Sequence, residues 1–207
     1  MKVLVLNGSP HPHGCTATAL DEVIRTLNAD GIETELMQIG REEIRGCSAC
    51  HYCDTHEGCV VDDKVNDAAK KFEEADGLLI GSPVYYGSPN GTILSFMDRL
   101  FYSTSFSKQM KVGAAVVSAR RGGNTASFDV LNKYFTISGM PVASGTYWNQ
   151  VHGFTPEDVK KDLEGLQTMR NVARNMAFMI RAFAQAREKE GYPVMETGCF
   201  TSFPDGK

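Results

Sequence analysis

The sequence predicts an α/β fold, in which five parallel strands form a sheet that helices cover on both faces. One observation is a series of short apolar runs that end in turn residues, such as KVLVLNGSP at residues 2–10 and DGLLIGSP at 76–83. A second is the helical spacing of apolar residues in the segments between these runs. Alternating strands and helices imply a parallel sheet with right-handed crossovers, and therefore three layers, α/β/α.

The first half of the chain is predicted to contain three strands and two helices. The first buried strand leads into a helix over residues 15–29, whose apolar spacing stops at Gly31. Residues 32–39, IETELMQI, alternate in polarity and predict the second strand. After a long loop, Asp62 or Asp63 can cap a helix, and DGLLIGSP then returns as the third strand.

The second half of the chain repeats this unit. A helix is expected over residues 89–102, followed by the strand KVGAAVVSA at 111–119 and a helix at 124–138. A short fifth strand near residues 141–144 is expected to complete the sheet. A long helix over 156–189 is expected to end the fold.

Length and composition favour a single globular domain over residues 1–207, with residues 40–62 as a cysteine-rich loop insertion. Apolar residues make up 42% of the chain and charged residues 22%, which supports a well-packed core. The formal net charge of −4 argues against a nucleic-acid partner. No apolar run approaches the roughly 20 residues of a membrane-spanning helix, and the apolar start is too short for a signal peptide. A cytoplasmic location is therefore expected, where cysteines are more often metal ligands or redox groups than disulfides.

Three loops rich in Gly, Ser and Pro follow the predicted strands at their carboxyl ends, the edge at which open α/β sheets bind ligands. They read NGSPHPHGCT at 7–16, GSPVYYGSPNGT at 81–92 and SARRGGNT at 118–125. The first loop joins a strand to a helix N-terminus, where free N–H groups suit a phosphate, although an ordinary turn with a serine cap fits the residues equally well. Neither G-x-G-x-x-G nor the P-loop pattern occurs in the sequence, so the phosphate need not belong to a dinucleotide or ATP.

Together these three loops resemble the flavin-binding loops of NADPH-dependent FMN reductases, a branch of the flavodoxin-like superfamily. The resemblance runs from the first strand to the last helix and implies a flavodoxin-like three-layer α/β/α sandwich that binds FMN. It implies that the FMN phosphate is held by Ser9, Cys15, Thr16 and Ala17. It implies that the isoalloxazine edge lies along Pro83, Val84, Tyr85, Tyr86 and Gly87, and that the third loop closes the site with Ser118, Ala119, Arg120 and Gly123. Cys15 departs from the family, whose members often carry Asn there.

The chemistry of the second loop agrees with a flavin. A turn over residues 83–87 can offer successive backbone N–H groups to the ring edge while a Tyr packs on the ring. The alternative for Tyr85 and Tyr86 is an aromatic pair at a strand end that covers the core. Of Arg120 and Arg121, one is expected to meet a phosphate and the other to be solvated.

Four of the chain's six cysteines lie in residues 47–59, which read CSACHYCDTHEGC and contain Cys47, Cys50, Cys53 and Cys59. Their spacing, C-x2-C-x2-C-x5-C, resembles the compact motif of iron-sulfur flavoproteins in the same superfamily and implies a [4Fe-4S] cluster. Zinc, with His51 or His56 as a substitute ligand, and free or redox-active thiols are the alternatives. We favour free thiols, because the chain has no second cysteine set and a flavin reaction does not need a cluster.

The function expected from the resemblance is an FMN-dependent oxidoreductase that takes a hydride from NADH or NADPH and reduces a small acceptor. Candidate acceptors are a quinone, a nitro or azo aromatic, and an activated alkene. FMN would carry the chemistry, so His152 is only a candidate proton donor, with a turn-stabilising role as the alternative.

The rival functions are an iron-sulfur flavoprotein or a flavodoxin-type electron carrier, and a thiol or metal module with a vestigial FMN site. The resemblance also implies a homodimer or higher homo-oligomer, since it places the flavin near a subunit contact.

Overall fold

Five parallel strands form the central sheet of the computed structural model, which describes residues 1–199, 201 and 203. They are β1 (Lys2–Asn7), β2 (Glu33–Gln38), β3 (Gly77–Tyr85), β5 (Val112–Ala119) and β6 (Gln150–His152). Their order across the sheet is β2-β1-β3-β5-β6. A two-residue strand, β4 (Ser88–Pro89), pairs antiparallel with the end of β3. This is the flavodoxin-like order of a doubly wound sheet, with its switch point between β1 and β3.

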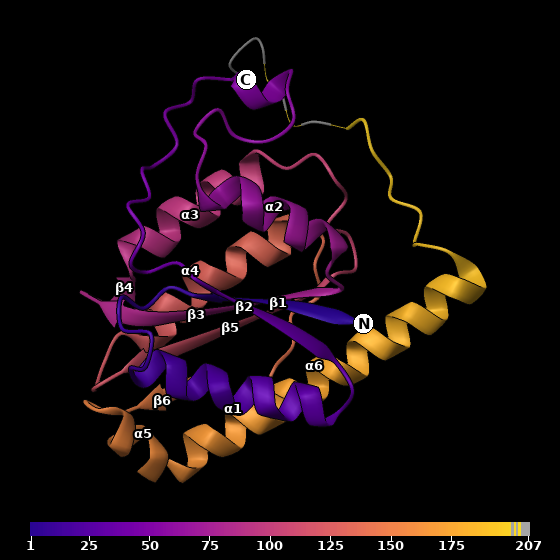
Figure 1. Ribbon diagram of the computed structural model, residues 1–207. Coiled ribbons are helices and arrows are strands. Elements are labelled where there is room, and N and C mark those ends of the chain that lie inside the picture. Colours follow the sequence, from indigo (N-terminus) through magenta and orange to yellow (C-terminus); the bar gives the residue numbers. More distant parts are fainter. Residues whose placement is uncertain (200, 202, 204–207) are drawn as a thin grey trace.

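Helices cover both faces of this sheet, as Figure 1 shows with the sheet seen nearly edge-on. One layer contains α1 (Cys15–Ala29), α5 (Pro156–Lys161) and α6 (Leu163–Glu190). The other contains α2 (Lys64–Glu74), α3 (Gly91–Tyr102) and α4 (Asn124–Ile137). The three-layer sandwich predicted from the sequence is therefore confirmed. In the described part of the chain, no helix is both long enough and apolar enough to cross a membrane.

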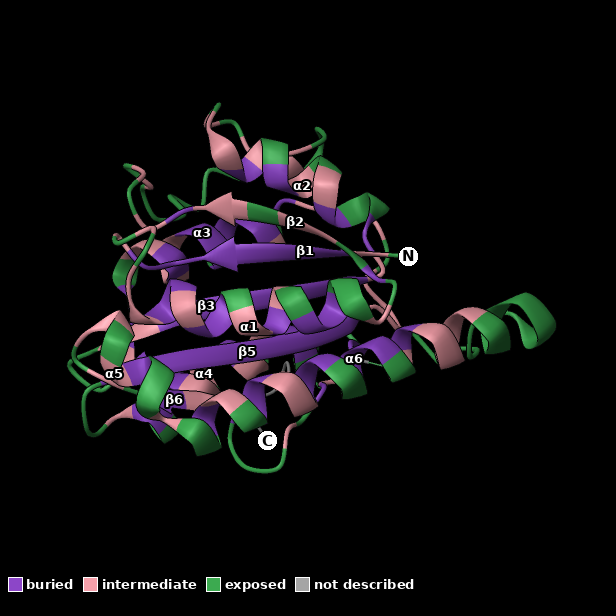
Figure 2. Ribbon diagram, turned by 60° about the horizontal axis from the view of Figure 1, so that its bottom comes forward, coloured by how far each residue is buried: buried purple, intermediate pink, exposed green. Residues whose placement is uncertain are grey.

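The core consists of two apolar clusters, one on each side of the sheet. Side chains of β1 point alternately to the two faces of the sheet. Val3 and Val5 face the layer of α1 and α6, and Leu4 and Leu6 face the layer of α2, α3 and α4. Figure 2 shows the consequence: β1, β3 and β5 are buried along most of their length, the edge strand β2 is intermediate to exposed, and the helices are buried along one stripe. The carboxyl ends of the strands remain at one edge, where the loops of the candidate site lie.

The fifth strand differs from the prediction, because it lies at Gln150–His152 and not near residues 141–144. Val142 makes only an isolated bridge to Gly113. Asn149 then accepts a hydrogen bond from Gly145 N at 3.0 Å, which closes a turn and delivers β6 alongside Val117–Ala119. A three-residue strand carries too little periodicity to be recognised in a sequence.

The long C-terminal helix is also interrupted, contrary to the prediction of one helix over 156–189. Asp162 has a non-helical backbone, ends α5 and caps α6 by accepting a hydrogen bond from Gly165 N at 2.9 Å. Its second carboxylate oxygen accepts a hydrogen bond from His152 N at 2.7 Å. One aspartate therefore caps α6 and links the break between the two helices to the end of β6.

Candidate functional site

The three Gly-rich loops meet at the carboxyl edge of the sheet. Gly8 N donates a hydrogen bond to Gly81 O at 2.8 Å, which joins the first loop to the second. The hydroxyls of Thr16 and Ser118, both buried, lie 2.8 Å apart and join the first loop to the third. The sequence prediction that these loops converge is thus confirmed by their direct contacts.

The start of α1 is a place where a phosphate fits. No described side chain caps this helix and its first turn carries no acidic residue, so the N–H groups there remain available for an anion. Ser9 is buried with its hydroxyl accepting from His11 N at 3.1 Å, and Ala17 is buried in the first turn. These neighbours narrow the loop around the backbone N–H groups.

The Cys15 side chain contacts the segment that follows β6. Its Sγ lies 3.7 Å from the Gly153 carbonyl. Burial raises the pKa of this thiol, so it stays protonated at neutral pH. The backbone N–H of Cys15 lies at the uncapped start of α1, and the expectation that this residue helps to hold a phosphate remains a prediction.

The second loop forms a tight hairpin between β3 and β4. Tyr86 and Gly87 both have positive φ, 50° and 75°, as a two-residue hairpin turn requires. Tyr85 and Tyr86 are exposed, so the alternative in which this pair covers the core is wrong. Pro83 and Val84 are half-buried below them. The loop therefore presents backbone and aromatic surface to the space at the sheet edge.

The third loop packs directly on this hairpin. A Cβ added at Gly123 would lie 2.8 Å from Gly87 Cα and 2.8 Å from Val84 Cγ1, so the close approach requires glycine. Ala119 is at the edge of burial, and both Arg120 and Arg121 are exposed. The expectation that one of these arginines meets a phosphate remains a prediction.

Two polar residues at the start of α4 were missed by the sequence reasoning. Asn124 Nδ2 and Ser127 Oγ are buried and have no hydrogen-bond partner among the described residues. Asn124 follows directly after Gly123, which packs on the hairpin, and Ser127 is the fourth residue of α4. A ligand with hydrogen-bonding edges, such as the pyrimidine part of a flavin, would fit such orphaned groups. The sequence signal was the Asn after the Gly pair, which reads equally well as a helix start.

His152 lies at the same edge of the sheet, in register with Ala119 on the neighbouring strand. Its Nδ1 is 3.8 Å from Asp162, and its ring is exposed. Tyr147 and Trp148 line the same shallow pocket, and their exposed rings pack edge to face with centroids 4.5 Å apart. This placement is compatible with a role for His152 at the acceptor side of the site.

The cysteine segment leaves the flavin loops and runs beside α3. Gly40 packs against the first loop, since an added Cβ would lie 2.2 Å from Ser9 C. A Cβ added at Gly46 would meet only Ser95 Oγ of α3, at 3.9 Å. The segment then reaches the C-terminal end of α3. This end lies about 17 Å along the 12-residue helix from its start, at 1.5 Å per residue.

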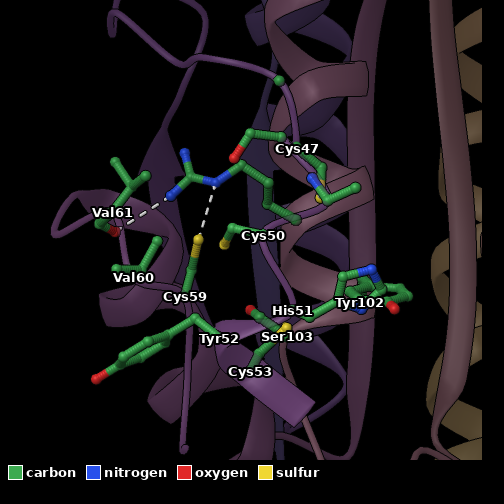
Figure 3. Close-up of a pocket in the computed structure, with 14 residues that line it drawn as sticks. Cys47, Cys50, His51, Tyr52, Cys53, Cys59, Val60, Val61, Tyr102 and Ser103 are labelled. Atoms are coloured by element: carbon green, nitrogen blue, oxygen red, sulfur yellow. Dashed lines mark hydrogen bonds between the residues drawn. The ribbon is translucent and has the colours of Figure 1, made fainter.

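All four motif cysteines line one pocket, together with Arg99, Tyr102 and Ser103 at the end of α3 (Figure 3). The backbone turns sharply there, because Ala49 and His51 both have positive φ. Ala49 N donates to Cys47 Sγ at 3.4 Å, and Arg99 Nε donates to Cys59 Sγ at 3.3 Å. Hydrogen bonds to sulfur of this kind surround thiolates in iron-sulfur sites.

Four thiolates can hold either a [4Fe-4S] cluster or zinc, so neither group needs a histidine here. His51 Nδ1 bonds Asp54 at 2.9 Å, and the His56 ring stacks on Tyr52 with ring centroids 4.1 Å apart. Burial raises the pKa of Cys53, and the neighbouring Asp54 adds to the shift. As the side chains stand, no three potential ligands within the described residues are gathered for a metal.

Comparison with known proteins identifies the class to which this fold and site belong. The sequence pattern of the NADPH-dependent FMN reductase family matches residues 1–154, and the chain belongs to this family. It is therefore an NAD(P)H-dependent, FMN-containing oxidoreductase, as the resemblance implied.

Two relatives cover nearly the same length. An iron-sulfur flavoprotein of Methanocaldococcus jannaschii is 33% identical over 87% of this chain and 98% of its own. An iron-sulfur flavoprotein of Methanosarcina thermophila is 28% identical over 91% of this chain and 100% of its own.

Solved structures confirm the flavodoxin-like fold. RosB with a bound 8-demethyl-8-formylriboflavin-5'-phosphate intermediate superposes with a TM-score of 0.70, at 18% identity, over 99% of this chain and 93% of RosB. A flavodoxin from the domain Archaea superposes with a TM-score of 0.57, at 16% identity, over 87% of this chain and 99% of the flavodoxin.

Proposed function

We propose that this oxidoreductase is an iron-sulfur flavoprotein, in which Cys47, Cys50, Cys53 and Cys59 hold a [4Fe-4S] cluster. The observation that carries the proposal is the single pocket lined by all four cysteines, with N–H donors directed at two of the sulfurs. The names of the two relatives support it. The sequence alone favoured free thiols, and these two observations together move our preference to the cluster.

In this proposal the flavin site lies at the N-terminal end of α3 and the cluster site at its C-terminal end. Bound FMN would accept a hydride and release its two electrons one at a time. A cluster would carry these single electrons. The N-terminus of α1 holds the phosphate, and Thr16 and Ser118 fix the spacing of the loops around it. The hairpin at Tyr86 and Gly87 covers one edge of the flavin. The cysteine pocket at the other end of α3 lies on the surface, where a protein partner can approach.

Kinetics with two acceptors test this proposal. Under anaerobic conditions, NADPH is expected to drive reduction both of cytochrome c, a one-electron protein acceptor, and of menadione, a small two-electron acceptor. Cys53→Ala is expected to lower the rate with cytochrome c at least about tenfold and to leave the menadione rate within about twofold, with FMN content unchanged. The matched control Cys199→Ala, at an exposed cysteine outside the motif, should change neither rate.

Equal rates with cytochrome c in wild type and Cys53→Ala would reject the cluster as the exit for electrons. The second candidate function would then stand: direct reduction of a quinone, a nitro or azo aromatic, or an activated alkene at the flavin. The exposed hairpin and the pocket beside His152 favour it, because a planar molecule can reach the sheet edge there.

Three further statements belong to the proposal. We propose that residues 1–207 act as one domain and that the chain forms a homodimer or higher homo-oligomer without nucleic-acid or membrane partners. We also propose a cytoplasmic location, because the four motif cysteines must stay reduced, without disulfides, to hold a cluster. A monomer by light scattering at micromolar concentration would contradict the homo-oligomer.

A further inference from the structure

Arg99 is the largest fully buried side chain in the described part of the protein, with 1% of its side chain exposed. A buried guanidinium is costly unless its five N–H donors are satisfied. All five are used here: Nε bonds Cys59 Sγ, Nη1 bonds Asp63 Oδ2 and Arg45 O, and Nη2 bonds Asp63 Oδ1 and Val61 O. The two bonds to Asp63, at 2.6 and 3.0 Å, form a bidentate ion pair.

These partners lie on both sides of the cysteine motif. Arg45 precedes the first cysteine, whereas Val61 and Asp63 follow the last one. Figure 3 draws the bonds to Cys59 and Val61 as dashed lines that diverge from one guanidinium. A single side chain of α3 therefore holds the two ends of the cysteine segment together and touches one of its sulfurs.

We propose that Arg99 is a positioning residue for the cluster, which fixes Cys59 as the fourth ligand and sets the reduction potential through its hydrogen bond to that sulfur. This inference rests on the proposed function. A positive donor at a ligating sulfur stabilises the reduced, more negative state of a cluster and so raises its potential. Asp63 opposes this effect because its carboxylate neutralises the same guanidinium at 2.6 Å.

The pair Arg99 and Asp63 thus predicts shifts of opposite sign. Arg99→Gln removes the charge and is expected to lower the cluster potential. Asp63→Asn leaves the guanidinium without its counter-charge and is expected to raise the potential. Asn also caps helices well, so Asp63→Asn keeps the bond from Val65 N that starts α2. Arg99→Lys keeps a charge without the planar fork and is expected to fall between wild type and Arg99→Gln.

The experiment is an anaerobic redox titration of wild type and the three variants, followed by electron paramagnetic resonance of the reduced cluster, with iron content measured on each sample. Opposite shifts for Arg99→Gln and Asp63→Asn support the proposal. Iron-loaded variants whose potentials equal that of wild type, or shift in the same direction, overturn it and leave Arg99 a structural residue. If Arg99→Gln does not fold, Asp63→Asn decides alone, because an unchanged or lower potential overturns the proposal. Wild-type protein without iron would instead reject the proposed function itself.

Discussion

Gly40→Ala is expected to weaken FMN binding at least about tenfold and to lower the free energy of unfolding by about 1–3 kcal/mol. The added Cβ would lie 2.2 Å from Ser9 C and 2.3 Å from Gly8 O. Both contacts are with backbone atoms of the first loop, so no side-chain rotation can relieve them. The loop must move, and with it the N–H groups at the start of α1. Fluorescence titration of the apoprotein with FMN and urea denaturation measure the two effects.

Gly91→Ala is the matched control for this substitution. Gly91 begins α3 immediately after the second loop, and an added Cβ there meets no atom within 4 Å. The Gly91→Ala variant should bind FMN with wild-type affinity, and its free energy of unfolding should stay within about 1 kcal/mol of the wild-type value. Wild-type FMN affinity in Gly40→Ala would show that the first loop does not hold the flavin.

Alanine at any one of the four motif cysteines is expected to reduce iron from about four atoms per chain to below about 0.4. The loss is expected at each position, because a cubane in such a motif is held by four Cys thiolates and all four cysteines line this pocket. His51 and His56 are engaged by Asp54 and Tyr52, respectively. Iron and acid-labile sulfide are measured on anaerobically purified variants, together with FMN from its absorbance.

Two controls separate ligand loss from general damage. Cys199→Ala, outside the motif, should keep its iron, and so should Cys15→Ala, whose Sγ contacts Gly153 near the flavin loops. All six variants should retain FMN, since the cysteine pocket and the start of α1 lie at different places in the fold. Variants that keep iron after loss of Cys50 or Cys53 would contradict the assignment of ligands.

Most of the fold could be predicted from the sequence, because strands and helices here carry strong periodicity. The helix at Cys15–Ala29 has the predicted bounds. Asp63 caps the start of α2, and it is one of the two aspartates predicted for this role. The failures are local. β6 has three residues, β4 has two, and Asp162 divides α5 from α6 through side-chain hydrogen bonds that no hydrophobic pattern encodes.

The candidate site was predicted less completely than the fold. Loop composition and the predicted parallel strands indicated correctly that the three loops meet, since parallel strands end at one edge of the sheet. Three features depend on tertiary contacts between distant segments: the contact of the Cys15 side chain, the unpaired Nδ2 of Asn124 and the hydrogen bonds of Arg99. Arg99 pairs with Asp63, 36 residues away, although Asp98 is its neighbour in sequence. Such a pair cannot be inferred from spacing along one chain.

The electron capacity of the protein tests the central claim, that one chain carries both FMN and a cluster. Protein purified anaerobically is titrated with dithionite while absorbance and electron paramagnetic resonance are recorded. FMN takes two electrons and a [4Fe-4S] cluster takes one, so the account predicts about three electrons per chain and a paramagnetic signal from the reduced cluster. Saturation at about two electrons, with the spectrum of a flavin alone, would contradict it.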